Sequence, residues 1–125
     1  MELNEYQKKA MGTCMPSCMN YSYMMGNLSA EVGEFHGKVC KAQRHGLITY
    51  SEEGDIWWKI DTESAGDAMI ELNQELMKEA GDILWQLAGL CKVMGWELET
   101  IAQMNLKKLA SRQKRGVIDG SGDNR

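Results

Sequence analysis

The sequence has a single proline, Pro16, and hardly any strand-like alternation of polar and apolar residues. Because proline interrupts helices and alternation marks strands, this predicts a chain that is nearly all helix. No apolar run approaches the ~20 residues needed to cross a bilayer. The first residues lack the apolar core of a secretion signal, so we expect a cytoplasmic protein that does not act at a membrane.

An excess of basic residues is also missing. The net charge is −4, which argues against a surface for a nucleic acid polymer but leaves a single nucleotide possible. Cys14 and Cys18 lie four residues apart, whereas Cys40 and Cys91 stand alone. A zinc site could recruit His36, which lies four residues before Cys40 on the same helical face, but these spacings lack the two close ligand pairs of a closed zinc module. We expect thiols packed as small apolar side chains instead.

What the sequence does contain is enough apolar residues, 43% of 125, for one folded domain. We expect this domain at residues 1–116 and a polar, glycine-rich, disordered tail at 117–125. A long connection, 47–64, carries Trp57 and Trp58, which should cover a core edge, a partner subunit or a ligand. Asn4 is the expected N-cap of the first helix, and the helices are expected at residues 5–13, 21–45, 66–94 and 97–113.

Two pairs of acidic residues are the most informative feature: Glu31 with Glu34, and Glu79 with Asp82. Residues three apart lie on one face of a helix, so each pair presents two carboxylates from one wall. Both pairs adjoin apolar residues and should therefore border the core. Acids gathered there repel one another unless they are protonated or bind cations, and oxygen ligands suit Mg²⁺ or Mn²⁺.

A simpler interpretation is two solvated helix faces with ion pairs such as Glu34 to Lys38. The glycine inside each pair, Gly33 and Gly81, argues against it. Glycine destabilises a helix by about 1 kcal/mol relative to alanine. A glycine at these positions is therefore expected where another backbone or a ligand must come close.

Three segments, 28–34, 75–88 and 104–112, together resemble the MazG-like nucleotide pyrophosphohydrolases of the all-α NTP pyrophosphatase superfamily. The resemblance extends over about residues 3–115. It implies an all-α, four-helix-bundle-like domain that assembles into a homodimer or homotetramer. It also implies Mg²⁺-dependent cleavage of a nucleoside triphosphate to a monophosphate and pyrophosphate.

Carried over by position, the resemblance implies that the catalytic metal ligands are Glu31, Glu34, Glu79 and Asp82. It implies nucleotide contacts for Asn105, Lys108 and Arg112, which by themselves indicate only a basic, solvated helix end. Lys38 and Lys41 are further phosphate-binding candidates, with surface ion pairing as the alternative. Many relatives have tyrosine where this chain has Gln86, so a hydroxyl contact to phosphate is expected to be missing.

Two other hypotheses remain. The first is a non-catalytic helical interaction or regulatory module of the same fold, in which the acids only solvate the helices. The second is an oxidative di-metal bundle, which is disfavoured because neither His36 nor His45 follows a glutamate by three residues.

Overall fold

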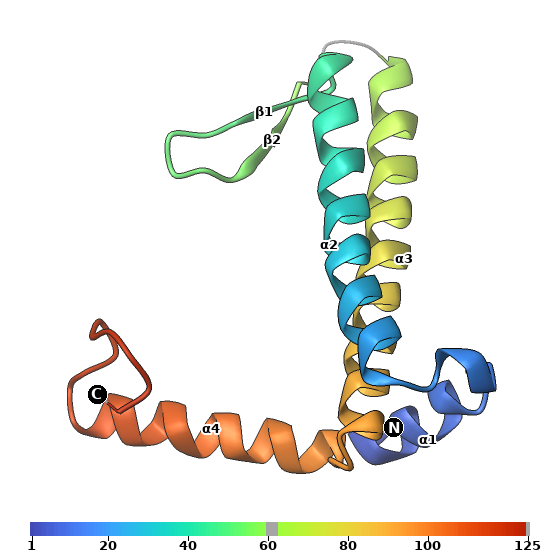
Figure 1. Cartoon of the computed structure of the whole chain (residues 1–125). Coiled ribbons are helices and arrows are strands. Elements are labelled where there is room, and N and C mark those ends of the chain that lie inside the picture. Colours follow the sequence, from blue (N-terminus) through green and yellow to red (C-terminus); the bar gives the residue numbers. More distant parts are fainter. Residues whose placement is uncertain (60–62, 125) are drawn as a thin grey trace. The chain divides into compact units, whose positions relative to one another are not determined.

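A computed structural model of the chain describes residues 1–59 and 63–124, with side chains in the second range described from residue 65. The predicted all-α class is confirmed. A short 3₁₀ turn, η1 (Pro16–Cys18), follows the first helix, and the α-helices are α1 (Leu3–Met11), α2 (Tyr21–Arg44), α3 (Glu63–Val93) and α4 (Leu98–Lys114) (Figure 1). Among the described residues, no helix is both long enough and apolar enough to span a bilayer.

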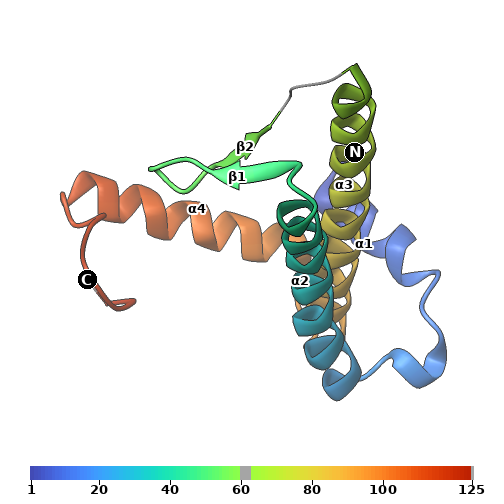
Figure 2. The same cartoon turned by 90° about the horizontal axis from the view of Figure 1, so that it is seen from above.

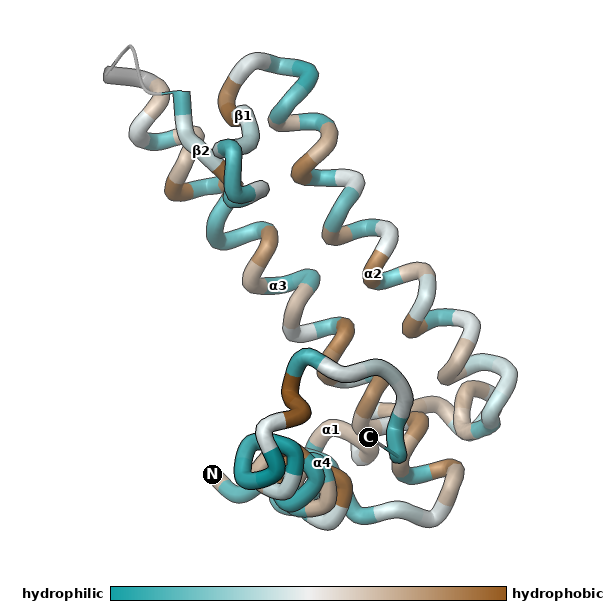
Figure 3. Tube along the Cα trace, turned by 90° about the vertical axis from the view of Figure 1, so that its left-hand side faces the viewer, coloured by the Kyte–Doolittle hydropathy of each residue, from teal (hydrophilic) through white to brown (hydrophobic). Residues whose placement is uncertain are grey.

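The chain divides into two compact units, one of residues 22–87 and the other of residues 1–21 with 88–125. In the first unit, α2 and the larger part of α3 run antiparallel and side by side (Figures 1 and 2). Polar and apolar residues alternate along both helices with helical spacing (Figure 3). This pattern lets each helix bury one face while the other remains exposed.

Three helices end at a glycine in the left-handed conformation, as expected for α2 and α3. The φ angles are 74° at Gly46, 74° at Gly95 and 66° at Gly116. The backbone N–H of the residue after each glycine donates a hydrogen bond to a carbonyl of the preceding helix. At the end of α2, Leu47 N lies 3.0 Å from Ala42 O. Such an amide satisfies a carbonyl that the helix leaves unpaired, and the positive φ favours glycine there.

A β-hairpin occupies much of the predicted connection, and the sequence analysis missed it. Strands β1 (Ile48–Tyr50) and β2 (Ile56–Trp58) pair antiparallel, with Ile48 opposite Trp58. Both triplets consist of β-branched and aromatic residues around a turn with Gly54, which is a recognisable hairpin signal. Residues 60–62 of the predicted connection lie outside the described residues.

The hairpin contributes to the core of residues 22–87. Val39 and Ala42 of α2, Ile48 of β1 and Leu76 of α3 form a buried cluster. Partly buried apolar residues pack against this cluster: Phe35, Leu47, Trp58 and Leu72. Trp58 therefore covers a core edge, one of the predicted roles, whereas the neighbouring Trp57 is 63% exposed.

In the other unit, the side-chain amides of Asn4 and Gln7 of α1 form hydrogen bonds at the start of α4. The buried Gln7 side chain donates to the carbonyls of Ala88 and Trp96 at 3.2 and 3.1 Å, and accepts from Leu98 N at 3.1 Å. Asn4 Oδ1 accepts from Glu99 N at 3.0 Å. The prediction that Asn4 caps its own helix was wrong, because this side chain satisfies an unpaired amide of α4 while Glu2 takes the N-cap position of α1.

Candidate metal centre and anion-binding residues

Three of the four predicted metal ligands meet in the structure. Glu31 of α2 and Glu79 and Asp82 of α3 each offer a carboxylate oxygen, and these oxygens all lie within 4.8 Å of one another. The antiparallel pairing of α2 with α3 brings the two pairs of acids together, and the spacing of three puts Glu79 and Asp82 on one face. Glu79 is buried, Glu31 is partly buried and Asp82 is exposed, so the cluster of these three acids lies between the core and solvent.

Glu34, the fourth predicted ligand, stands outside this cluster. Its side chain is exposed on α2, one turn after Glu31. Its charge nevertheless acts on the cluster, because Glu34 is among the acids that raise the pKa of Glu31.

The electrostatics of the cluster are those of crowded acids. Burial raises the pKa of Glu31 most, followed by the charges of Glu34, Asp82 and Glu79. Asn27 Nδ2 donates a hydrogen bond of 3.2 Å to Glu31 Oε1, which orients the carboxylate. A cation among these oxygens would relieve the repulsion between the acids.

Lys38 of α2, predicted as a phosphate-binding candidate with surface ion pairing as the alternative, contacts two acids of α3. Its Nζ lies 2.9 Å from Glu75 Oε2 and 3.1 Å from Glu79 Oε1. Hydrogen bonds to these carboxylates raise the pKa of Lys38. Glu75 also accepts from Lys78 at 2.6 Å, and the two lysines lower the pKa of Glu75 to about 2.

A cavity of about 340 Å³ opens beside these ion pairs, between α2 and α3. Lys38, Lys41 and His45 supply the basic part of its lining, and Glu71 and Glu75 the acidic part. The two predicted lysines thus share one cavity, although Lys38 is engaged by Glu75 and Glu79.

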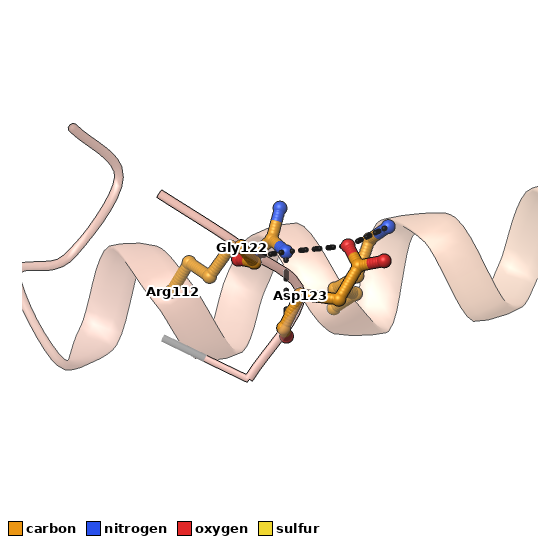
Figure 4. A network of polar contacts seen from close by, with 4 residues as sticks. Arg112, Gly122 and Asp123 are labelled. Carbon is orange, nitrogen blue, oxygen red and sulfur yellow. Dashed lines mark hydrogen bonds and ion pairs between the residues drawn. The ribbon is translucent and has the colours of Figure 1, made fainter. Parts of the chain in front are cut away.

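The remaining predicted residues, Asn105, Lys108 and Arg112, lie on α4 in the other unit. The side chain of Arg112 is buried, and its Nη2 contacts the carbonyls of Gly122 and Asp123 and, at 3.1 Å, Asp123 Oδ1 (Figure 4). Lys108 Nζ lies 3.5 Å from the same carboxylate oxygen. Arg112 and then Lys108 lower the pKa of Asp123.

Lys108 and Arg112 converge on one carboxylate, which makes them a candidate anion site. Arg112 Nε is buried with no hydrogen-bond partner among the described residues, so the guanidinium keeps unused donor capacity. Asn105 and Lys108 also line a shallow cavity of about 330 Å³ with Ile101 and Met104.

The MazG nucleotide pyrophosphohydrolase domain matches residues 20–117, which include both pairs of acids and the residues of α4. The chain belongs to the MazG family. Its activity class is therefore nucleotide pyrophosphohydrolase in general. A curated relative, "Gene 37 protein" of Mycobacterium phage L5, is 37% identical over 116 residues, which cover 91% of this chain and 83% of that protein. No solved structure matches the chain.

Two site features escaped the sequence analysis. The contact of Lys38 with Glu75 joins two helices, so no spacing within one helix predicts it. The contact of Arg112 with Asp123 was missed because Asp123 lies in the segment predicted to be disordered. Arg125 of that segment lies outside the described residues. Gln86 follows Asp82 by one turn of α3, and its buried Oε1 has no partner in the described part of the chain. The sequence had already singled out Gln86 as a position where a hydroxyl contact is expected to be missing, and the structure adds that its acceptor oxygen is buried.

Proposed function

We propose that this protein hydrolyses ribo- or deoxyribonucleoside triphosphates to a nucleoside monophosphate and pyrophosphate, with Mg²⁺ as its cofactor. The proposal depends chiefly on one observation: Glu31, Glu79 and Asp82 converge from two helices in a chain of the MazG family. A triphosphate carries its negative charge in the phosphates, so an acidic site needs a cation to receive it.

The acids fit such a cation. Carboxylate oxygens are the hard ligands that Mg²⁺ prefers, and Mn²⁺ accepts the same set. Glu31, Glu79 and Asp82 would hold the ion, since their oxygens lie within 4.8 Å of one another. When bound, the metal supplies Lewis-acid polarisation of a phosphoryl group and lowers the pKa of a coordinated water.

The chain itself supplies the base and the positioning of the substrate. Glu34 is exposed and stands outside the cluster, so it is the glutamate we assign to accept a proton from the attacking water. Lys41 lines the cavity beside the acids and would pair with phosphate oxygens there, together with Lys38.

On α4, Asn105, Lys108 and Arg112 would bind a phosphate or the sugar of the nucleotide. The support is the carboxylate of Asp123 between Lys108 and Arg112, because a phosphate offers the same kind of acceptor oxygens.

The test is release of pyrophosphate from mixed nucleoside triphosphates with Mg²⁺. Glu79→Gln and Asp82→Asn should each lower kcat/KM on the order of 100-fold, because each removes a carboxylate that would hold the metal ion. Asp67→Asn is the matched control: it makes the same change on α3, at an exposed position outside the cluster. Near-normal hydrolysis by Glu79→Gln would refute the proposal.

A second candidate is a non-catalytic interaction module of the same fold. One observation favours it: Lys38 already pairs with Glu75 and Glu79, so part of the acidic charge is balanced without a metal. Under this hypothesis the wild-type protein releases no pyrophosphate, and Mg²⁺ leaves its melting temperature unchanged.

We also propose that the protein works in the cytoplasm as a homodimer or homotetramer. Large apolar side chains of α3 remain exposed at Ile70, Met77 and Leu84, spaced seven residues apart. A helix face of this kind is suited to pack against another copy of the chain.

A further inference from the structure

We propose that Lys38 is a built-in counter-ion of the acidic cluster, which divalent cations must displace from Glu79 in order to bind. The inference rests on the proposed metal site at Glu31, Glu79 and Asp82. It concerns a residue of the chain that would set the affinity of that site, rather than a ligand of the metal.

The first argument is geometric. Lys38 Nζ lies 3.1 Å from Glu79 Oε1, and Glu79 is one of the three acids whose oxygens converge. An ammonium at this distance already occupies acceptor capacity of the Glu79 carboxylate. Binding of a metal ion to the same oxygen would therefore weaken the ion pair between Lys38 and Glu79, and the lysine charge would repel the metal.

The second argument is burial. The side chain of Glu79 is 10% exposed and that of Lys38 is 33% exposed, so water screens this pair less than a surface pair. Leaving the Glu79 carboxylate unpaired in this setting costs stability, and Lys38 removes that cost in the metal-free protein.

The third argument is that Glu75 keeps Lys38 in place. Glu75 Oε2 accepts from Lys38 at 2.9 Å, while Glu75 Oε1 accepts from Lys78 at 2.6 Å. When Glu79 is taken by a metal, Lys38 retains its contact with Glu75. Its ammonium then stays beside the cavity that Lys41 also lines, where it can meet a phosphate of the substrate.

The experiment measures Mn²⁺ binding to the full chain by electron paramagnetic resonance of free Mn²⁺, with no nucleotide present. Lys38→Met should bind Mn²⁺ roughly three- to tenfold more tightly than wild type, the range expected for loss of one partly screened charge. Its metal-free melting temperature should fall, and its rise on adding Mg²⁺ should exceed that of wild type.

Two variants serve as controls. Lys78→Met removes the other lysine bound to Glu75 and changes the net charge equally, so its Mn²⁺ affinity should change less than that of Lys38→Met. Lys38→Arg keeps the charge and should bind Mn²⁺ like wild type. Lys38→Gln provides a second neutral variant should the methionine variant not fold.

The outcomes separate this inference from the proposed function. Wild type that binds Mn²⁺ together with Lys38→Met of unchanged or weaker affinity overturns the counter-ion role alone. Wild type that binds no Mn²⁺ at millimolar concentration overturns both. Equal tightening by Lys38→Met and Lys78→Met also overturns the inference, because the effect is then one of net charge.

Discussion

The carboxylates of Glu31 on α2 and Glu75 on α3 lie in electrostatic environments of opposite kind. Glu31 is surrounded by acids and partly buried, and its pKa is raised above the ordinary 4.5. Glu75 is held by Lys78 and Lys38, and its pKa is lowered from 4.5 to about 2. The two residues therefore act on the free energy of unfolding in different pH ranges and with opposite sign.

The metal-free protein should show both effects. Charged Glu31 destabilises the fold above its folded pKa, and this cost disappears as pH falls through that value toward 4.5. Glu75 stabilises the fold above pH 4.5, and its contribution is lost as pH falls from 4.5 to about 2. In EDTA, urea unfolding should report a free energy that rises on mild acidification from neutral pH and falls in stronger acid.

Glu31→Gln is the control for this pH profile: it should abolish the rise and keep the fall. Mg²⁺ at pH 7 should raise the melting temperature of wild type and flatten the rise, because only the folded state presents the three acids. A free energy of unfolding that declines steadily from pH 7 downward contradicts the prediction.

At the scale of elements, most helix boundaries follow from local signals in the amino-acid sequence. The expected helix 21–45 is Tyr21–Arg44, and the expected 66–94 is Glu63–Val93, because Gly46 and Gly95 end both helices by a local mechanism. The prediction that Asn4 caps its own helix failed because its side chain bonds to Glu99 N, which is 95 residues away in the sequence.

The same contrast holds for the site. The spacing of three predicts that Glu79 and Asp82 share a face, because helix geometry determines it. That Glu31 joins them while Glu34 stands outside depends on the register between α2 and α3, which neither pair encodes. The contacts of Lys38 with Glu75 and Glu79 depend on the same register.

Replacing Gly81 tests why α3 carries a glycine between Glu79 and Asp82. A Cβ at Gly81 would meet no described atom within 4 Å, so alanine fits the isolated chain. Gly81→Ala should raise the free energy of unfolding by about 0.5–1 kcal/mol, measured in urea. It should also lower hydrolysis, because the position is expected to admit a ligand or a second backbone.

Gly66→Ala is the control, since Gly66 also lies on α3 with open space around its Cβ position but away from the acids. It should stabilise the fold and leave hydrolysis unchanged. Full activity of Gly81→Ala would show that the glycine serves no close approach.

The tail contact with α4 predicts competition between Asp123 and substrate. Asp123 occupies Lys108 and Arg112 but is itself 85% exposed, so a phosphate can replace it at small cost. Asp123→Asn should lower KM for a nucleoside triphosphate roughly two- to fivefold, with kcat unchanged. Asp119→Asn, an exposed change in the same segment, should leave KM unaltered; an equal effect of both would point to net charge.

For the whole molecule, exposed apolar area is the feature that remains to be accounted for. Ile70, Met77 and Leu84 of α3 are 55%, 67% and 38% exposed, and Leu87 on the same face is 37% exposed. A spacing of seven residues keeps such side chains on one stripe of a helix, the pattern by which helices of separate chains pack together. A soluble monomer rarely leaves several large apolar side chains aligned along one helix face in water.

Light scattering should therefore give a mass of at least twice 14.1 kDa at micromolar concentration. Met77→Lys places a charge in the middle of the stripe, which costs a packed interface far more than it costs an exposed helix face, so the mass should shift toward 14.1 kDa. Ile118→Lys makes the same kind of change at a residue that is 52% exposed but outside α3, and it should leave the mass unchanged. A wild-type mass of one chain would contradict the assembly, and a Met77→Lys protein that stays assembled would move the interface away from this stripe.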